Sequence, residues 1–189
     1  MNLTLHGKTL LVALALVFYC AAPAADDKYD IIITKSLQAL DVVQGDQVVK
    51  QYHVAFGKGG NGPKREAGDS KTPLGVYKII DFNNNSNFYY FMLLDYPNLL
   101  DAWYGYKNNI ISAAEFKKIA TAYKSRQKPP QNTRLGGNIG IHGIGKVTSE
   151  RMMIHEGFNW TNGCIALTND QINELKKYVS IGTKVVIRE

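Results

Sequence analysis

Short runs of β-branched and aromatic residues, separated by glycine, asparagine and proline, recur along most of the chain. Runs of this length and composition are typical of β-strands, and the residues between them favour turns. The pattern predicts strands at residues 30–35, 39–43, 47–56, 74–81, 88–97, 139–143 and 183–187. The first three follow one another closely through a Gly45-Asp46 turn, so we expect them to form an antiparallel meander.

Two segments carry the periodicity of helices instead. Ser112 and Glu115 have the spacing of a capping box, and apolar residues then recur at helical spacing until Pro129. Thr168 and Gln171 repeat this signal before a second apolar stripe, which consists of Ile172, Leu175 and Val179. The pattern as a whole predicts a fold that is mainly β with α, in the α+β class.

The segments between these elements carry weaker signals. The polar run at 82–87 predicts a turn, and 98–106 and 131–137 show no clear periodicity. The segment that holds Arg151 and His155 is interpreted as a loop.

Residues 1–24 have the pattern of a secretory signal peptide. Lys8 precedes an apolar core at 9–19, and the small-residue site that follows predicts cleavage after Ala24. The core is shorter than the roughly 20 residues of a transmembrane helix. We therefore expect export to the periplasm or cell envelope, without stable membrane insertion after cleavage.

Cleavage decides how the two cysteines are interpreted. A lipid anchor at Cys20 is the less favoured alternative, because Tyr19 is bulky where a small residue is expected. If Cys20 is removed, Cys164 is the only cysteine left and can form no intramolecular disulfide. A single thiol in an oxidising compartment is a chemical liability unless it has a use, although a buried, inert cysteine is the simpler alternative.

The bulk composition limits the remaining classes of protein. With 189 residues, of which 45% are hydrophobic, residues 25–189 suit a single globular domain. The formal charge of +6 falls by one when Lys8 is removed, and this excess suits either an anionic polymer or a solvated basic surface. No block of lysine and arginine interleaved with aromatics points to nucleic acid.

The surroundings of Cys164 are those of a nucleophile. Gly163 precedes it, and an apolar run leads to the helix signal at Thr168, whose amide dipoles are expected to favour the thiolate. His142 ends an apolar strand 22 positions upstream. An ordinary thiol has a pKa of roughly 8.5, so catalysis near neutral pH needs a base, and imidazole can both accept and return the proton.

These residues resemble the L,D-transpeptidase catalytic domain, the YkuD-like family of cell-wall cysteine enzymes. The resemblance is carried by His142-Gly143, by Thr161-Asn162-Gly163-Cys164, and by the segment from Gly68 to Tyr77 that contains Thr72-Pro73. It covers most of residues 29–81 and 136–189. The chain departs from the family pattern at Asn162, where the family usually has histidine, and at Ala166, where it usually has arginine.

The resemblance implies a fold: an L,D-transpeptidase-like β-sandwich or barrel with a helical insertion and a helix after the cysteine. The segment at about 82–135, which it does not cover, is expected to be that insertion, packed near the site as a lid, a substrate wall or plain structural cover.

The resemblance also implies roles for the site residues. Cys164 would be the nucleophile, His142 the general base and acid, and Gly143 would orient the imidazole through its backbone. Thr161, Asn162 and Gly163 would form the oxyanion and substrate-binding segment. Asn162 carries no titratable group, which strengthens the assignment of His142 as base.

The implied function is that of a periplasmic peptidoglycan L,D-transpeptidase. Its substrates would be peptidoglycan stem peptides, attacked at the carbonyl of the L-centre of meso-diaminopimelate with loss of the terminal D-alanine. An amine of a second stem would then resolve the thioester into a new cross-link. No cofactor is expected.

Three alternatives stay open. A hydrolase on the same scaffold, either an L,D-carboxypeptidase or an amidase, would use water as acceptor. A non-catalytic peptidoglycan-binding module would catalyse neither transfer to an amine nor hydrolysis. A zinc site at His53, His142, His155 and Cys164 is disfavoured because these residues lack tight spacing, so we expect no metal. The oligomeric state has no signal in the sequence.

Overall fold

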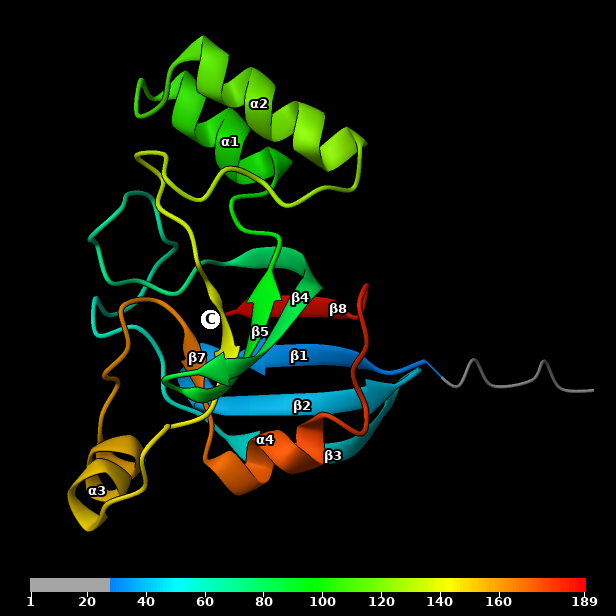
Figure 1. Cartoon of the computed structure of the whole chain (residues 1–189), viewed down its shortest axis with the longest axis vertical. Coiled ribbons are helices and arrows are strands. Elements are labelled where there is room, and N and C mark those ends of the chain that lie inside the picture. Colours follow the sequence, from blue (N-terminus) through cyan, green and yellow to red (C-terminus); the bar gives the residue numbers. More distant parts are fainter. Residues whose placement is uncertain (1–27) are drawn as a thin grey trace, which may run out of the picture.

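The computed structural model describes residues 28–189, so the predicted signal peptide and its cleavage site lie outside the described residues. Eight strands form one mixed sheet in the order β3-β2-β1-β8-β4-β5-β6-β7 (Figure 1). The strands are β1 (Asp30–Thr34), β2 (Ala39–Gln44), β3 (Gln47–His53), β4 (Gly75–Ser86), β5 (Tyr89–Leu94), β6 (Gly140–His142), β7 (Ile165–Ala166) and β8 (Lys184–Arg188). The helices are the 3-10 turn η1 (Lys35–Leu37) and α1 (Leu99–Lys107), α2 (Ala113–Lys124), α3 (Ser149–Gly157) and α4 (Asn169–Leu175).

The sheet confirms the predicted α+β fold and the antiparallel meander of β1, β2 and β3. The last strand, β8, pairs in parallel with β1 and antiparallel with β4, so the C-terminal segment joins the two parts of the sheet. An isolated antiparallel bridge between Ala55 and Ala166 connects the segment after β3 to β7. Because β3 and β7 are the two ends of the strand order, this bridge gives the sheet a barrel-like closure.

The core lies inside this curved sheet. Alternate residues of the strands face inward and are buried, as in Ile31 and Ile33 of β1 and Leu40 and Val42 of β2. Helix α4 covers the core with Ile172 and Leu175, which confirms two positions of its predicted stripe. The helix ends at Leu175, so Val179 packs against the core from beyond the helix.

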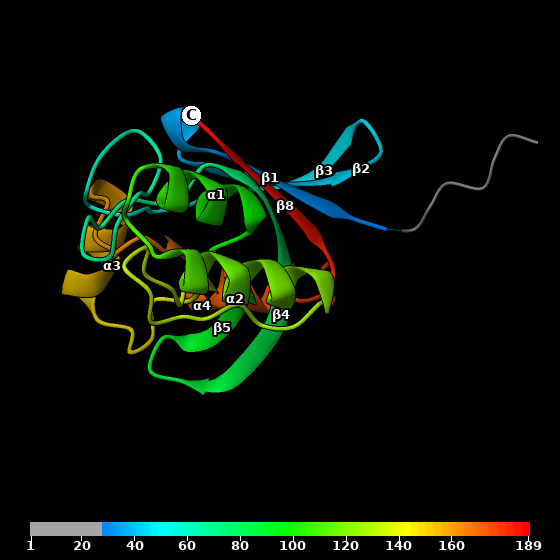
Figure 2. The same ribbon diagram turned by 90° about the horizontal axis from the view of Figure 1, so that it is seen from above.

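Helices α1 and α2 lie at one end of the molecule (Figure 1), and the view from above shows them side by side (Figure 2). They share a second hydrophobic cluster of Ala102, Ile111, Ile119 and Leu135. The predicted capping box of Ser112 and Glu115 begins α2. Residues 98–106, for which the sequence predicted no helix, form most of α1, because Asn98 and Asp101 cap one another and start it.

Two other local predictions are corrected. The polar run 82–87 is not simply a turn: β4 continues to Ser86 and pairs with β5 through Ser86 and Tyr89. The helical segment therefore begins after the sheet hairpin, at Leu99, and the predicted boundary at 82 falls inside β4. The predicted loop around Arg151 is helix α3, because the Thr148 side chain caps its N-terminus.

None of the helices in residues 28–189 has the length and apolar composition that crossing a membrane requires.

Candidate active site

The predicted base His142 ends β6, and the predicted nucleophile Cys164 directly precedes the neighbouring strand β7, on the same face of the sheet. Strands β6 and β7 are parallel, with Ile141 opposite Ile165 and His142 opposite Ala166. Extending this register by one residue places Cys164 level with Gly140. Because side chains alternate along a strand, Cys164 and His142 project to the same side, two residues apart along the sheet.

The thiol of Cys164 lies against the start of β6. Its sulfur donates a hydrogen bond to the Asn138 carbonyl oxygen at 3.4 Å. Burial raises the pKa of the thiol to about 11, while the Gly140 backbone and the Lys64 charge act in the opposite direction. The expectation that helix dipoles favour the thiolate is therefore wrong: β7 separates Cys164 from α4, and desolvation dominates.

His142 is held as a neutral imidazole. Its Nδ1 lies 2.7 Å from the carbonyl oxygen of Gly143, as expected if Gly143 orients the ring. Burial lowers the pKa of His142 to about 4; the Gly143 contact opposes this shift, and nearby His155 adds to it. Since a carbonyl oxygen only accepts hydrogen bonds, the proton must sit on Nδ1, which leaves Nε2 as the basic nitrogen.

Gly143 has room for no side chain. A Cβ at this position would lie 2.6 Å from Asn169 Oδ1 and 2.9 Å from the Phe88 carbonyl oxygen. The Gly143 amide donates to the Tyr90 carbonyl oxygen at 3.2 Å. These contacts fix the position of the carbonyl group that orients His142.

Three aromatic rings surround the imidazole. The centroid of Phe88 lies 4.4 Å away, Phe91 is stacked at 5.8 Å, and Trp160 meets the imidazole edge-on at 5.9 Å. Trp160 also donates from Nε1 to Nδ1 of buried His155 at 3.4 Å. The run of aromatics at 88–91 is the sequence signal for two of these three rings.

The residues before the cysteine form a tight turn. The Thr161 hydroxyl donates to the Cys164 carbonyl oxygen at 2.7 Å and accepts from the Gly163 amide at 3.1 Å. The Gly163 amide is therefore engaged within the turn, and the Cys164 amide is the better oxyanion candidate. Asn162 is exposed beside the turn, while Thr161 is buried.

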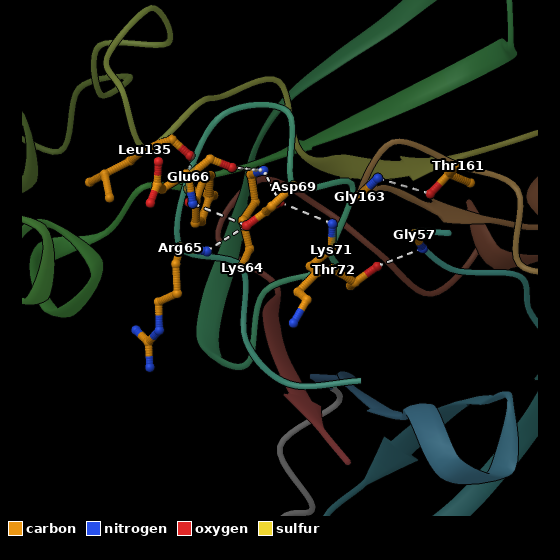
Figure 3. A network of polar contacts seen from close by, with 11 residues as sticks. Gly57, Lys64, Arg65, Glu66, Asp69, Lys71, Thr72, Leu135, Thr161 and Gly163 are labelled. Atoms are coloured by element: carbon orange, nitrogen blue, oxygen red, sulfur yellow. Dashed lines mark hydrogen bonds and ion pairs between the residues drawn. The ribbon is translucent and has the colours of Figure 1, made fainter. Parts of the chain in front are cut away.

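The loop at 57–73 packs against this turn (Figure 3). Gly163 has φ +129°, and a Cβ there would lie 2.7 Å from the Lys71 carbonyl oxygen. Within the loop, Lys64 pairs with Asp69 at 2.7 Å, and Asp69 also accepts from the backbone amides of Arg65, Glu66 and Lys71. The Gly68–Tyr77 segment that carried the family resemblance thus contributes a wall of the site, whereas sequence reasoning did not identify Lys64.

The histidines do not gather into a metal centre. Within residues 28–189, no group of three or more histidine, cysteine, aspartate or glutamate side chains is arranged to hold a metal ion. His53 lies near His155, with ring centroids 6.3 Å apart.

Solved structures with the same fold come from several bacteria. The helical cell shape determining protein Pgp2 from Campylobacter jejuni matches with a TM-score of 0.53 and 23% identity, over 86% of this chain and 48% of that one. Bd1075 from Bdellovibrio bacteriovorus matches with a TM-score of 0.51 and 22% identity, over 85% of this chain and 47% of that one. The chain thus spans about half the length of these proteins, and the likeness is one of fold. No curated protein is similar enough to match the chain.

Cys164 and His142 thus face the same side of the β6–β7 pair, beside the loop at 57–73. Residues 28–187 match the L,D-transpeptidase catalytic domain family (YkuD), and the chain belongs to that family. This confirms the resemblance seen in the sequence.

Proposed function

We propose that the chain is an exported peptidoglycan L,D-transpeptidase that works through a thioester on Cys164. The family consists of cysteine L,D-transpeptidases and acts on peptidoglycan stem peptides. The observation that carries the proposal is the register of β6 and β7, which puts Cys164 and His142 on one face of the sheet.

The first half-reaction forms the thioester. Nε2 of His142 takes the thiol proton as the sulfur attacks the carbonyl of the diaminopimelate L-centre. In this proposal the Cys164 amide donates to the developing oxyanion, a contact commonly worth about 3 kcal/mol of barrier. His142 then returns its proton to the amine of the terminal D-alanine, the C–N bond breaks, and D-alanine leaves.

The second half-reaction restores the enzyme. An amine of another stem attacks the thioester carbonyl, His142 accepts a proton from that amine, and the C–S bond breaks with the proton returning to sulfur. The product is a new amide cross-link, and no oxidant or metal takes part in these steps.

The resting pair is neutral. A thiol pKa of about 11 and an imidazole pKa of about 4 both favour thiol and neutral imidazole over the ion pair. Proton transfer must therefore accompany the attack, once the substrate has covered the site. This differs from cysteine enzymes whose resting state is a thiolate–imidazolium pair.

Hydrolysis on the same scaffold is the second candidate. It is favoured by Ala166, which is fully buried opposite His142 and leaves no arginine at a position where the family usually has one. Without that cation, an acceptor stem would lose one contact to its carboxylates, and water would compete better. An L,D-carboxypeptidase or an amidase would result. A non-catalytic peptidoglycan-binding module is the alternative outside enzymes.

Product analysis separates these functions. The purified domain is incubated with disaccharide-tetrapeptide muropeptides, with Cys164→Ala as the matched control, and the products are identified by mass spectrometry. We expect cross-linked dimers from the unmodified protein and none from the variant. Trimmed monomers alone would establish hydrolysis. Binding of the muropeptide without any product would indicate a non-catalytic peptidoglycan-binding module.

A further inference from the structure

Lys64 is a buried cation beside the cysteine segment. Its side chain is 3% exposed, and its Nζ donates to Asp69 Oδ1 at 2.7 Å and to the Glu66 carbonyl oxygen at 2.8 Å. Lysine is almost never fully buried unless it is paired, because removing an ammonium group from water is costly. A hydrophobic side chain could fill the same space at less cost, so the charge itself calls for an explanation.

The Lys64–Asp69 pair holds one wall of the cysteine site. Asp69 Oδ1 accepts from the Lys71 amide at 3.0 Å, and the next group along that backbone, the Lys71 carbonyl, lies against Gly163. Burial alone would raise the pKa of Asp69, but Lys64 and the backbone donors of Glu66, Lys71 and Arg65 hold that pKa below its usual value. The carboxylate is therefore charged at neutral pH and holds the loop in this shape.

Lys64 also packs against the stretch of chain that precedes β6. A Cβ on Gly136 would lie 3.3 Å from Lys64 Cε, so the lysine stem packs over Gly136. Two residues further on, the Asn138 carbonyl accepts the hydrogen bond from the Cys164 thiol. The Ala67 amide ties this stretch to the loop by donating to the Arg134 carbonyl oxygen at 2.7 Å. The loop segment that lies against Gly163 and the stretch that accepts the thiol hydrogen bond thus both adjoin this ion pair.

The charge of Lys64 also bears on the protonation of Cys164. Its ammonium group lowers the pKa of the Cys164 thiol against the effect of burial. Charges interact more strongly in a poorly solvated site than in water. Other charged or titratable groups of this region include His142 on β6, Asp69 paired with Lys64, Arg65 and Lys71 of the same loop, and the exposed pair of Glu66 and Arg134 at 3.9 Å.

We propose that Lys64 is a positioning residue for Cys164, which together with Asp69 fixes the two backbone segments that contact Gly163 and the Cys164 thiol and keeps a positive charge buried beside them. The inference rests on the proposed function only in taking Cys164 as the nucleophile. It assigns to the loop at 57–73 an electrostatic role beyond that of a wall.

The test measures the thiol without any peptidoglycan. Alkylation of Cys164 by iodoacetamide, a neutral reagent, is followed by mass spectrometry from pH 6 to pH 10, which gives the apparent pKa of the thiol. The main variant is Lys64→Met with Asp69→Asn, which removes both charges and leaves no unpaired carboxylate. Lys58→Met is the matched control, because it removes an exposed lysine from the same loop.

We expect the double variant to raise the thiol pKa, with about tenfold slower alkylation below the pKa for each unit of the rise. The Lys58→Met control should stay within about twofold of the unmodified protein, since an exposed charge is screened. Thermal unfolding checks that each variant is folded at the assay temperature. A folded double variant with the unmodified pH profile would overturn the proposal.

Asp69→Asn alone keeps the test decisive if the double variant does not fold. Asparagine retains an acceptor for the Lys71 amide but leaves the ammonium charge without its counter-charge. We expect a lower thiol pKa and faster alkylation near pH 8, the opposite direction to the double variant. A purely structural role predicts slower or unchanged alkylation in Asp69→Asn, and that result would overturn the proposal. Failure of the transpeptidase function would appear in product analysis instead and would leave these profiles unchanged.

Discussion

Nδ1 of His142 lies 2.7 Å from the carbonyl oxygen of Gly143, its immediate neighbour in the chain. This contact fixes both the tautomer and the orientation of the imidazole, a task that other cysteine and serine enzymes give to a separate aspartate or asparagine. The backbone orients the base at no cost in buried charge. Four consequences of this arrangement and its surroundings can be measured.

Replacing the base should nearly abolish acylation while the fold survives. We expect His142→Gln to slow acylation of Cys164 by a carbapenem by about 10² to 10⁴, the usual contribution of a general base. Intact-protein mass spectrometry gives the rate. His53→Gln changes an exposed histidine outside the site and should leave the rate unchanged. An equally fast His142→Gln variant would remove His142 from the mechanism.

Opening the aromatic cage should change the titration of His142. Burial lowers the pKa of His142 to about 4, and Trp160 supplies one of the three rings around the imidazole. In Trp160→Ala we expect water to enter and the pKa to rise towards 6.5. NMR titration of the imidazole signals measures the pKa. Trp160→Phe retains a ring and serves as the control; a similar rise in both variants would contradict the role of burial.

Stability should fall on mild acidification because His142 is buried in its neutral form. Between the ordinary pKa of about 6.5 and the folded value of about 4, the unfolded chain binds a proton that the folded protein does not. Stability is therefore complete above pH 6.5 and is lost as pH falls towards 4, by roughly 3 kcal/mol from this group.

Denaturant unfolding at pH 7 and pH 4.5 measures this loss. Other groups, including Asp69, add to it, so the informative quantity is the difference between the unmodified protein and His142→Gln. We expect a smaller loss in the variant. Equal losses in the two proteins would show that His142 titrates normally in the folded state.

A side chain at Gly163 should disturb the cysteine turn. Gly163 has φ +129°, and a Cβ there would lie 2.7 Å from the Lys71 carbonyl oxygen. We expect Gly163→Ala to lower the free energy of unfolding by about 1 to 3 kcal/mol and to slow acylation. Gly157→Ala, at the end of α3 where a Cβ meets nothing within 4 Å, is the matched control and should be close to neutral. Denaturant unfolding and the rate of Cys164 acylation are measured for both variants, and equal effects of the two substitutions would contradict the prediction.

The elements that sequence predicted best depend on local chemistry. The capping boxes at Ser112 and Thr168 were recognised because all their partners lie within three residues. Helix α1 was missed although its cap, Asn98 with Asp101, is equally local, because its turns include Gly105, a poor helix former. Helix α3 was missed because most of its side chains face solvent and leave no apolar stripe.

In the site, too, features set by local sequence could be predicted and features set by tertiary contacts could not. Cys164 and His142 could be identified from residue type and surroundings, and strand register then placed them on one face. The direction of the thiol pKa could not be predicted, because burial of Cys164 depends on the loop and on β6 rather than on its sequence neighbours. Lys64 carried no sequence signal because a buried ion pair is visible only after the loop has folded.

The most direct test of the account is a search for the acyl-enzyme itself. The protein is mixed with a disaccharide-tetrapeptide muropeptide, quenched during turnover, and analysed by peptide mapping and mass spectrometry. We predict a gain in mass equal to the disaccharide-tripeptide acyl group, located on Cys164 and absent from Cys164→Ala. Turnover by Cys164→Ala, or an acyl group attached to any other residue, would contradict the account.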